Sequence, residues 1–352
     1  MDKKIILMAA LMAGSFTGAY AQNEILDAAA AAAAAVNEAE KTEAPAPKPN
    51  YWTNSIGLAV GFTTTSLHSW AAGGYDTATL NSSFDGKADY KKDLMAWNNR
   101  LRLEYGFLYS EDKEGLIQKT NDRVYLESTW SYQTAKDSKL SYSAAFNFRS
   151  QFSNGYTYKT PGEGQKWKDA AVLKSSLLSP AYTNIALGIN WVPSKWFTLN
   201  VAPLTGGFTI VRNEPLRLIY GMDPRSGHEA SEAIKDAKGL LTNGDIFKAA
   251  RFEFGAQVKA DFKMVINDVF KYETQLVLFS DYLHEPKNLR VNWDNQISWQ
   301  LSKYFALGLK TWLIYDPNVL IVDDDHPNGI KLVQFKDFVS FNFTYTFDFK
   351  KK

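Results

Sequence analysis

The most constraining feature of this sequence is an alternation of apolar and polar residues that begins at Tyr51. Phe252 and Phe254, for example, alternate with Arg251 and Glu253, and the same period of two recurs along the chain. A period of two places apolar side chains on one face of a strand and polar ones on the other. The runs span 9 to 15 residues, whereas ordinary strands have about 5 to 6 and tilted membrane strands need about 9 to 11. Their length favours membrane-spanning strands over those of a soluble sandwich.

The alternating runs and their connections predict a closed membrane barrel. Twelve strands are expected, at residues 52–64, 77–90, 96–109, 121–133, 139–152, 181–192, 196–210, 250–264, 269–282, 289–301, 304–315 and 335–349. An even number brings both ends of a single-chain bacterial barrel to one side. Every second connection is short and the others are mostly long, with 28 residues at 153–180 and 39 at 211–249. We therefore predict an all-β fold over residues 51–349, a transmembrane antiparallel β-barrel with short periplasmic turns and long extracellular loops.

The N-terminal region carries the signals of export. Two early lysines form a basic region, residues 5–13 are apolar but too short to span a bilayer, and Ala19-Tyr20-Ala21 fits a cleavage site. We predict a signal peptide over residues 1–21, cleaved near Ala21. Residues 22–50 read as an Ala/Pro-rich periplasmic tail or linker, with a partner-binding helix in the alanine tract as the alternative. The expected location is the outer membrane of a Gram-negative cell.

Composition excludes several classes of function. The 39 basic and 38 acidic residues nearly balance, so we expect no nucleic-acid partner. The absence of cysteine excludes a disulfide framework, a thiolate nucleophile and any Cys-ligated metal. Beyond the N-terminus no apolar stretch reaches the roughly 18 residues of a spanning helix. We predict no cofactor.

Aromatic residues, 14% of the chain, gather beside the short turns and the two ends of the predicted barrel. The set comprises Trp52, Tyr90, Tyr132, Trp191, Trp196, Tyr272, Trp299, Tyr304, Tyr345 and Phe347. Amphipathic rings favour the headgroup level of a bilayer, so these residues predict a girdle in contact with outer-membrane lipid. A second, looser girdle is expected from Tyr109, Tyr282, Trp293 and Tyr315.

The last predicted strand, 335–349, also has an aromatic face. It resembles the C-terminal signal by which outer-membrane assembly machinery recognises its clients, although three lysines follow Phe349. The resemblance implies that the barrel-assembly machinery is a partner through this strand.

Three short motifs resemble a family of exported outer-membrane β-barrel proteins with no assigned function. They are Trp70-Ala71-Ala72-Gly73-Gly74, Trp97-Asn98-Asn99-Arg100-Leu101 with Tyr105-Gly106, and Ser179-Pro180-Ala181-Tyr182. The likeness extends over about residues 50–349, and Tyr75-Asp76 stands where an Asn is expected soon after the double Gly. The resemblance implies a fold and a location but no activity.

Few groups suggest catalysis or metal binding. Barrel phospholipases carry a Ser-His-Asn type of site, and four histidines fall in predicted extracellular loops, namely His68, His228, His284 and His326. Ser66 and Ser69 flank His68, but neighbours in sequence rarely supply the hydrogen-bond geometry that catalysis needs. Asp323-Asp324-Asp325 with Asn328 lacks a second acidic cluster, so a solvated loop is favoured over a cation site. We predict no enzyme, no catalytic residue and no metal ligand.

The longest loop contains an apolar stripe at helical spacing. Its members are Ala230, Ala233, Ile234, Ala237, Leu240 and Leu241, and Asn243-Gly244 follows as a stop. The spacing predicts a helix over residues 230–241. Two placements stay open, as a constriction in the barrel mouth or as packing between loops outside it.

Charged residues recur on the inward faces of the strands. Fourteen are candidates to line the lumen: Arg100, Arg102, Glu104, Arg123, Glu127, Arg149, Arg251, Glu253, Lys259, Asp261, Lys271, Glu273, Arg290 and Asp294. Eight more inward charges are Asp85, Lys87, Asp89, Lys263, Asp281, Lys310, Lys336 and Asp348. The two signs nearly cancel, so either a salt-bridged closed interior or a wet passage fits the pattern.

The leading functional interpretation is a passive channel or small-solute transport protein. Twelve strands spaced about 4.8 Å apart and tilted by about 40° give a backbone diameter of roughly 24 Å, which leaves a passage on the order of 10 Å between side chains. Small solutes are then candidate partners. The alternative is a structural or binding barrel with loop-mediated ligand recognition, and the third is a lipid-modifying enzyme.

Overall fold

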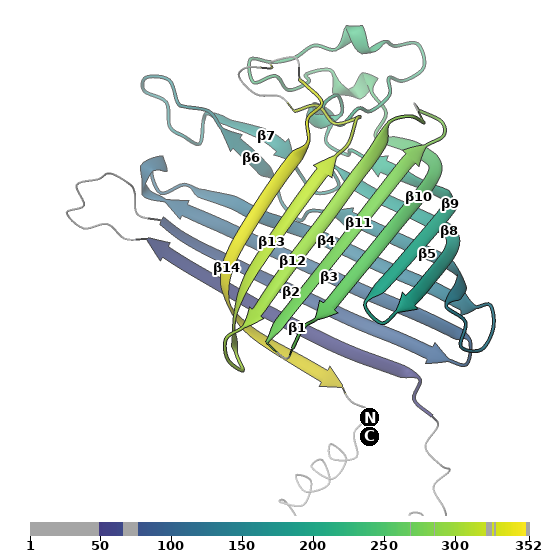
Figure 1. Cartoon of the computed structure of the whole chain (residues 1–352). Coiled ribbons are helices and arrows are strands. Elements are labelled where there is room, and N and C mark those ends of the chain that lie inside the picture. Colours follow the sequence, from purple (N-terminus) through teal and green to yellow (C-terminus); the bar gives the residue numbers. More distant parts are fainter. Residues whose placement is uncertain are drawn as a thin grey trace, which may run out of the picture. The chain divides into compact units, whose positions relative to one another are not determined.

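A computed structural model gives the fold of the chain and describes residues 49–65, 77–267, 269–284, 286–321, 326 and 329–349. Twelve long antiparallel strands close into one barrel (Figure 1). They are β1 (Trp52–Thr65), β2 (Thr77–Lys92), β3 (Met95–Ser110), β4 (Ile117–Gln133), β5 (Leu140–Ser150), β8 (Ala181–Ser194), β9 (Phe197–Ile210), β10 (Ala250–Val265), β11 (Phe270–Asp281), β12 (Leu289–Gln300), β13 (Phe305–Tyr315) and β14 (Gln334–Phe349). Within the described ranges, no helix has the length and apolar character needed to cross a membrane.

The order of the strands confirms the predicted topology. Each barrel strand pairs antiparallel with its neighbours along the chain, and β1 pairs with β14 to close the ring. The predicted strand ends agree with the structure to within four residues, the largest difference being at the start of β4. The protein is a twelve-stranded transmembrane β-barrel.

The outer wall of the barrel is apolar and the inner wall is polar. On β8, the outward Ile185 and Ile189 are 56% and 47% exposed, whereas Ala186 between them is fully buried. Glu104 and Gln257 point inward and are nearly buried. A band of large exposed apolar side chains suits lipid rather than water. The closed ladder also leaves no strand edge unpaired in the bilayer.

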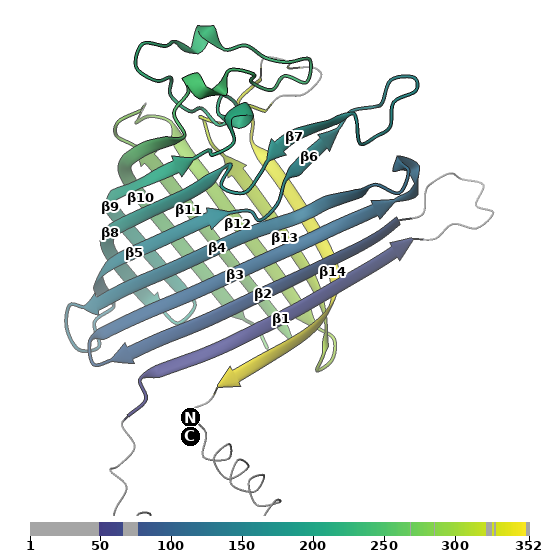
Figure 2. The same ribbon diagram turned by 180° about the vertical axis from the view of Figure 1, so that it is seen from behind.

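One end of the barrel, here called the turn end, carries the short turns and the first and last barrel residues (Figure 2). Aromatic rings contact each other along this rim. The ring centroids of Trp52 and Tyr90 are 5.3 Å apart, and those of Tyr304 and Tyr345 are 6.2 Å apart. Trp196 is 52% exposed on the same rim. The predicted gathering of rings at one rim is confirmed.

The opposite end, here called the loop end, carries a hairpin that the sequence pattern missed. β6 (Gly155–Tyr158) pairs with β7 (Ala171–Ser175) as a separate two-stranded sheet between β5 and β8. Asp122 near the start of β4 anchors the base of this hairpin. The Asp122 carboxylate accepts hydrogen bonds from the backbone amides of Phe152 at 2.7 Å and Ser153 at 2.8 Å. Lys119 Nζ lies 3.0 Å from the same carboxylate. This anchor fixes where the chain leaves the barrel wall.

The helix predicted over residues 230–241 is wrong. Loop 211–249 contains only three short 3-10 helices, η2 (Glu214–Leu216), η3 (Ala230–Glu232) and η4 (Gly244–Ile246). The Asp236 carboxylate accepts the backbone amide of Leu240 at 2.8 Å, and Gly239 has a φ of 78°. Side-chain hydrogen bonds of this kind compete with the helical pattern, so the segment forms a turn.

The apolar stripe of this loop is nevertheless buried in part. Leu241 packs with Val211, Leu216, Ile246 and Phe247 in a small apolar cluster at the loop end, and the side chain of Ala233 packs against it. Loop 211–249 therefore has a hydrophobic core of its own, which we call the cap core.

Candidate functional site

The middle of the lumen is crossed by ion pairs between opposite walls. Arg123 Nη2 on β4 lies 2.8 Å from Asp294 Oδ2 on β12, and these strands stand diametrically opposite in the ring order. Lys310 Nζ on β13 lies 2.7 Å from Glu104 Oε1 on β3. Side chains from facing walls therefore meet inside the barrel.

Further pairs complete this layer. Lys259 on β10 is paired with Glu127 on β4. Arg100 Nε donates to Asp85 Oδ1 at 2.8 Å, and its Nη2 lies 3.8 Å from Glu273 Oε2 on the far wall. We call this layer the ion-pair belt, with the members Asp85, Arg100, Glu104, Arg123, Glu127, Lys259, Glu273, Asp294 and Lys310.

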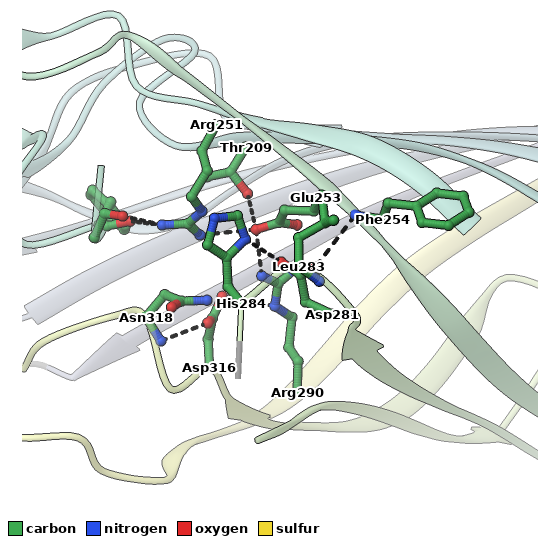
Figure 3. Close-up of polar contacts among 12 residues, drawn as sticks. Thr209, Arg251, Glu253, Phe254, Asp281, Leu283, His284, Arg290, Asp316 and Asn318 are labelled. Atoms are coloured by element: carbon green, nitrogen blue, oxygen red, sulfur yellow. Dashed lines mark hydrogen bonds and ion pairs between the residues drawn. The ribbon is translucent and has the colours of Figure 1, made fainter. Parts of the chain in front are cut away.

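A second cluster of charges lies nearer the loop end (Figure 3). Arg290 donates two hydrogen bonds, of 2.7 and 2.9 Å, to the Glu253 carboxylate, and Arg251 Nη2 lies 2.9 Å from the same carboxylate. Arg290 Nε also lies 3.0 Å from Asp316 Oδ2, as an ion pair outside hydrogen-bond geometry. Arg251 donates to the carbonyl of Gly221. The cluster thus ties the barrel wall to loop 211–249.

Two predicted lumen arginines contact aromatic rings. The Arg102 guanidinium lies 4.8 Å from the centre of the Tyr125 ring, and that of Arg149 lies 4.7 Å from the centre of the Tyr182 ring. The Arg102 Nε is buried and has no hydrogen-bond partner among the described residues. Cation–π contact replaces carboxylate pairing at both positions.

The remaining two predicted lumen residues lie toward the turn end. Asp261 Oδ1 accepts a hydrogen bond from Gln275 at 2.7 Å, and Asp261 Oδ2 lies 3.6 Å from Lys259 Nζ. Lys271 is exposed near the start of β11. Asp261 thus contacts the belt residue Lys259, whereas Lys271 lies outside the belt.

The belt separates two chambers. The loop-end chamber has a volume of about 600 Å³ and is lined in part by Arg149, Tyr182 and Trp312. The turn-end chamber has a volume of about 450 Å³ and is lined in part by Thr129 and Lys259. Two smaller cavities, of about 110 and 40 Å³, lie at the belt between them. They share lining residues with both chambers, so the four cavities follow one another along the lumen.

Loop 211–249 helps to roof the loop-end chamber. Ile219 and Tyr220 line it, and the Ile219 carbonyl accepts the backbone amide of Leu320 at 2.9 Å. The Tyr220 hydroxyl donates to the Lys174 carbonyl at 2.7 Å. The roof is thus fastened to two other loop-end segments.

These contacts correct the expected free passage on the order of 10 Å. The estimate assigned each wall a uniform layer of side chains, whereas long Arg and Lys side chains extend across the lumen to acids on the opposite wall. The loop segment 230–241 contributes no lining residue to the loop-end chamber. Its place is against the cap core, so the second of the two placements describes it.

The groups considered for catalysis or metal binding are only partly within the described residues. His228 Nδ1 lies 2.9 Å from Glu232 Oε2, and this hydrogen bond lowers the pKa of the Glu232 carboxyl. His284 Nδ1 lies 3.0 Å from Asp281 Oδ2. No group of three or more potential ligands from His, Asp and Glu gathers in the described part of the chain. Outside the described residues lie Ser66, His68, Ser69, Asp323-Asp324-Asp325 and Asn328.

The sequence interpretation missed several residues of the site. Tyr182 and Trp312 line the loop-end chamber, and both stand at inward positions of the alternating pattern, so the pattern itself carries the signal. Tyr220 and Asp316 lie in loops, where alternation says nothing about direction. The contacts of Tyr220 and Asp316 can be assigned only once the structure of the loops is known.

The chain matches one family model. Residues 62–156 match the family described as "Protein of unknown function (DUF3078)". The predicted resemblance to a family without assigned function is confirmed over this part of the barrel, which holds two of the three motifs. No curated protein is significantly similar to this sequence.

Several solved outer-membrane barrels are similar to the chain at low levels. The translocator domain of the autotransporter NalP from Neisseria meningitidis has 10% identity and a TM-score of 0.36, covering 91% of this chain and 97% of that one. An outer membrane channel from Pseudomonas putida F1 has 8% identity and a TM-score of 0.34, covering 88% and 100%. The outer membrane phospholipase A from Escherichia coli has 8% identity and a TM-score of 0.33, covering 88% and 96%. Similarity this weak does not bear on function.

Proposed function

We propose that this protein is an outer-membrane barrel for small-solute transport, with a lumen that is restricted at rest. In this proposal the loop end faces outside and receives the solute, and the turn end faces the periplasm. The aromatic rim contacts lipid, and β14 engages the barrel-assembly machinery. Seven of the fourteen lumen candidates belong to the belt, and Arg149 and Arg290 line the loop-end chamber.

One observation carries the proposal, namely the series of chambers on either side of the ion-pair belt. A barrel that serves only as a scaffold has no need of a loop-end chamber of about 600 Å³, a size typical of small-molecule sites. The route past the belt runs through the two small cavities that share walls with both chambers. Passage of a solute therefore requires some belt pairs to separate.

The competing candidate is a binding barrel that transports nothing, and the same belt favours it. Cross-lumen pairs such as Arg123–Asp294, at 2.8 Å, stabilise a closed interior. The two candidates differ in one measurable respect, because transport requires solute or ion flux and a binding barrel does not.

Planar-bilayer recording tests the proposal. We compare the wild-type barrel with the double variant Arg123→Gln/Asp294→Asn, which removes one belt pair without leaving a single buried charge uncompensated. The matched control is Asp223→Asn/Lys248→Gln, which removes an exposed pair with a distance of 3.8 Å in the loop-end region.

We expect a small conductance from the wild-type and control barrels and a several-fold larger one from the belt variant. Folding of each variant is checked by the change in electrophoretic mobility on boiling. No conductance from the wild-type and the belt variant alike would contradict transport and leave the binding barrel.

A further inference from the structure

In the part of the chain that the structure describes, the Arg149 guanidinium in the loop-end chamber has no acid beside it. Among the described residues, the Arg149 guanidinium lies 4.7 Å from the centre of the Tyr182 ring and has neither an ion-pair partner nor a hydrogen-bond acceptor. Arg149 lines the loop-end chamber and the small cavity beneath it. A guanidinium has five N–H donors in a fixed plane, and here those donors are available to whatever enters the chamber.

The acids that line this chamber are already engaged. Asp122 accepts backbone amides and pairs with Lys119 at 3.0 Å. Asp294 pairs with Arg123 at 2.8 Å, and Asp316 lies 3.0 Å from Arg290. None of the three is left to balance Arg149.

Of the other cations in the chamber wall, Arg123 is paired with Asp294, and Arg290 is paired with both Asp316 and Glu253. The Lys336 Nζ donates to the Thr120 carbonyl at 2.7 Å, and this neutral acceptor does not cancel its charge. Arg149 and Lys336 therefore supply positive charge that attracts anions into the chamber.

The rest of the wall is apolar and aromatic. Ile219, Ile314 and Leu320 line the chamber together with Tyr182, Tyr220 and Trp312. Such a lining favours a ligand with an apolar or aromatic body. A small inorganic anion would leave these side chains without contacts.

We propose that the loop-end chamber binds an organic anion, whose carboxylate or phosphate is held by Arg149 and whose apolar body packs against the aromatic wall. The Arg149 guanidinium lies over the Tyr182 ring, and this cation–π contact restrains its position. This inference rests on the proposed function and names the solute class that the loop end would receive.

Calorimetric titration of the full-length barrel in lipid nanodiscs tests the site. The probes are benzoate and phenyl phosphate as organic anions, benzamide as the neutral counterpart of benzoate, and inorganic phosphate as an anion without an apolar body. We expect the two organic anions to bind, and benzamide and inorganic phosphate to bind at least about tenfold more weakly. The relative affinity of benzoate and phenyl phosphate identifies the preferred head group.

Variants of one arginine supply the second part of the test. Arg149→Gln should weaken benzoate binding about tenfold or more, and Arg149→Lys should retain part of the affinity. The matched control is Arg212→Gln, since Arg212 is exposed and lies outside the chamber lining.

Equal binding of benzoate and benzamide by the wild-type barrel would overturn the proposal without any variant. Unchanged affinity in a folded Arg149→Gln barrel, judged by its mobility shift on boiling, would overturn it too. If the organic anions bind in an Arg149-dependent manner but the barrel conducts no current, transport is refuted and the proposed binding site stands. Conductance without benzoate or phenyl phosphate binding would refute this site alone.

Discussion

Arg217 organises the loop that roofs the lumen. Its side chain is nearly buried, and its guanidinium donates to the carbonyls of Gly244 at 3.0 Å, Phe247 at 3.1 Å and Val211 at 3.3 Å. These acceptors come from both ends of loop 211–249. One charged side chain therefore holds together backbone segments that no strand ladder connects.

Arg217→Met should loosen this loop while the barrel stays folded. The buried carbonyls would lose their charged donor, and an unsatisfied buried group costs about 1–3 kcal/mol. Limited proteolysis of the folded barrel should then cut within residues 211–249 about tenfold faster or more. The control is Arg212→Met, a substitution at an exposed neighbour. Equal cleavage rates in the two variants would show that Arg217 does not hold the loop.

We expect the stability of the same loop, 211–249, to depend on pH through the Tyr220 hydroxyl. Burial raises the pKa of the Tyr220 hydroxyl above its ordinary value of about 10. A raised pKa in the folded state stabilises the fold below the unfolded pKa, and this contribution is lost as the pH rises through the folded pKa. The difference in tyrosinate absorbance between the wild type and Tyr220→Phe should titrate well above pH 10. A difference that titrates near pH 10 would mean that the hydroxyl is exposed to water.

The charged lumen residues show which features of the site can be predicted from the sequence and which cannot. The alternation predicted that Arg123 and Asp294 point inward, because the direction of a side chain follows from its position in one strand. It did not predict that they pair, since the partner across a lumen depends on the tilt and stagger of all the strands. The lack of an acid beside Arg149 was hidden for the same reason.

At the scale of elements, the long strands were predictable and the loop end was not. Alternation over a dozen residues is a strong local signal, which fixed β10 to within one residue at each end. The hairpin of β6 and β7 has strands of only 4 and 5 residues, too short to show such a pattern. The expected helix over 230–241 failed because Asp236 and Gly239 favour a turn, which outweighs the spacing of the apolar residues.

The two faces of β9 give a test of the strand register. Leu204 lies midway along the strand and is 53% exposed on the outer wall, whereas Thr198 lines the turn-end chamber. Leu204→Arg should block assembly, because an arginine at the lipid face near the midplane costs about 2–4 kcal/mol. Thr198→Arg should assemble, since its side chain enters a polar cavity. The yield of heat-modifiable barrel in the membrane fraction is the measurement, and similar yields would contradict the register.

At the scale of the whole molecule, the barrel combines an apolar exterior with a charged and divided interior. The belt residues draw on strands from both sides of the ring, such as β4 and β12. The belt pairs neutralise charged side chains that have little access to water, because lipid surrounds the barrel and packed side chains fill its interior. The same pairs narrow the lumen between the loop-end and turn-end chambers. The ion pairs that stabilise the barrel therefore also restrict passage through it.

Thiol labelling from one side of the membrane tests this division most directly, because the chain has no cysteine of its own. Gln334→Cys places a thiol in the loop-end chamber and Thr129→Cys places one in the turn-end chamber. A small charged thiosulfonate added outside intact cells should label Gln334→Cys readily and Thr129→Cys far more slowly. Adding Arg123→Gln/Asp294→Asn should speed the labelling of Thr129→Cys. Equal labelling of the two thiols in the barrel with an intact belt would contradict a lumen divided by ion pairs.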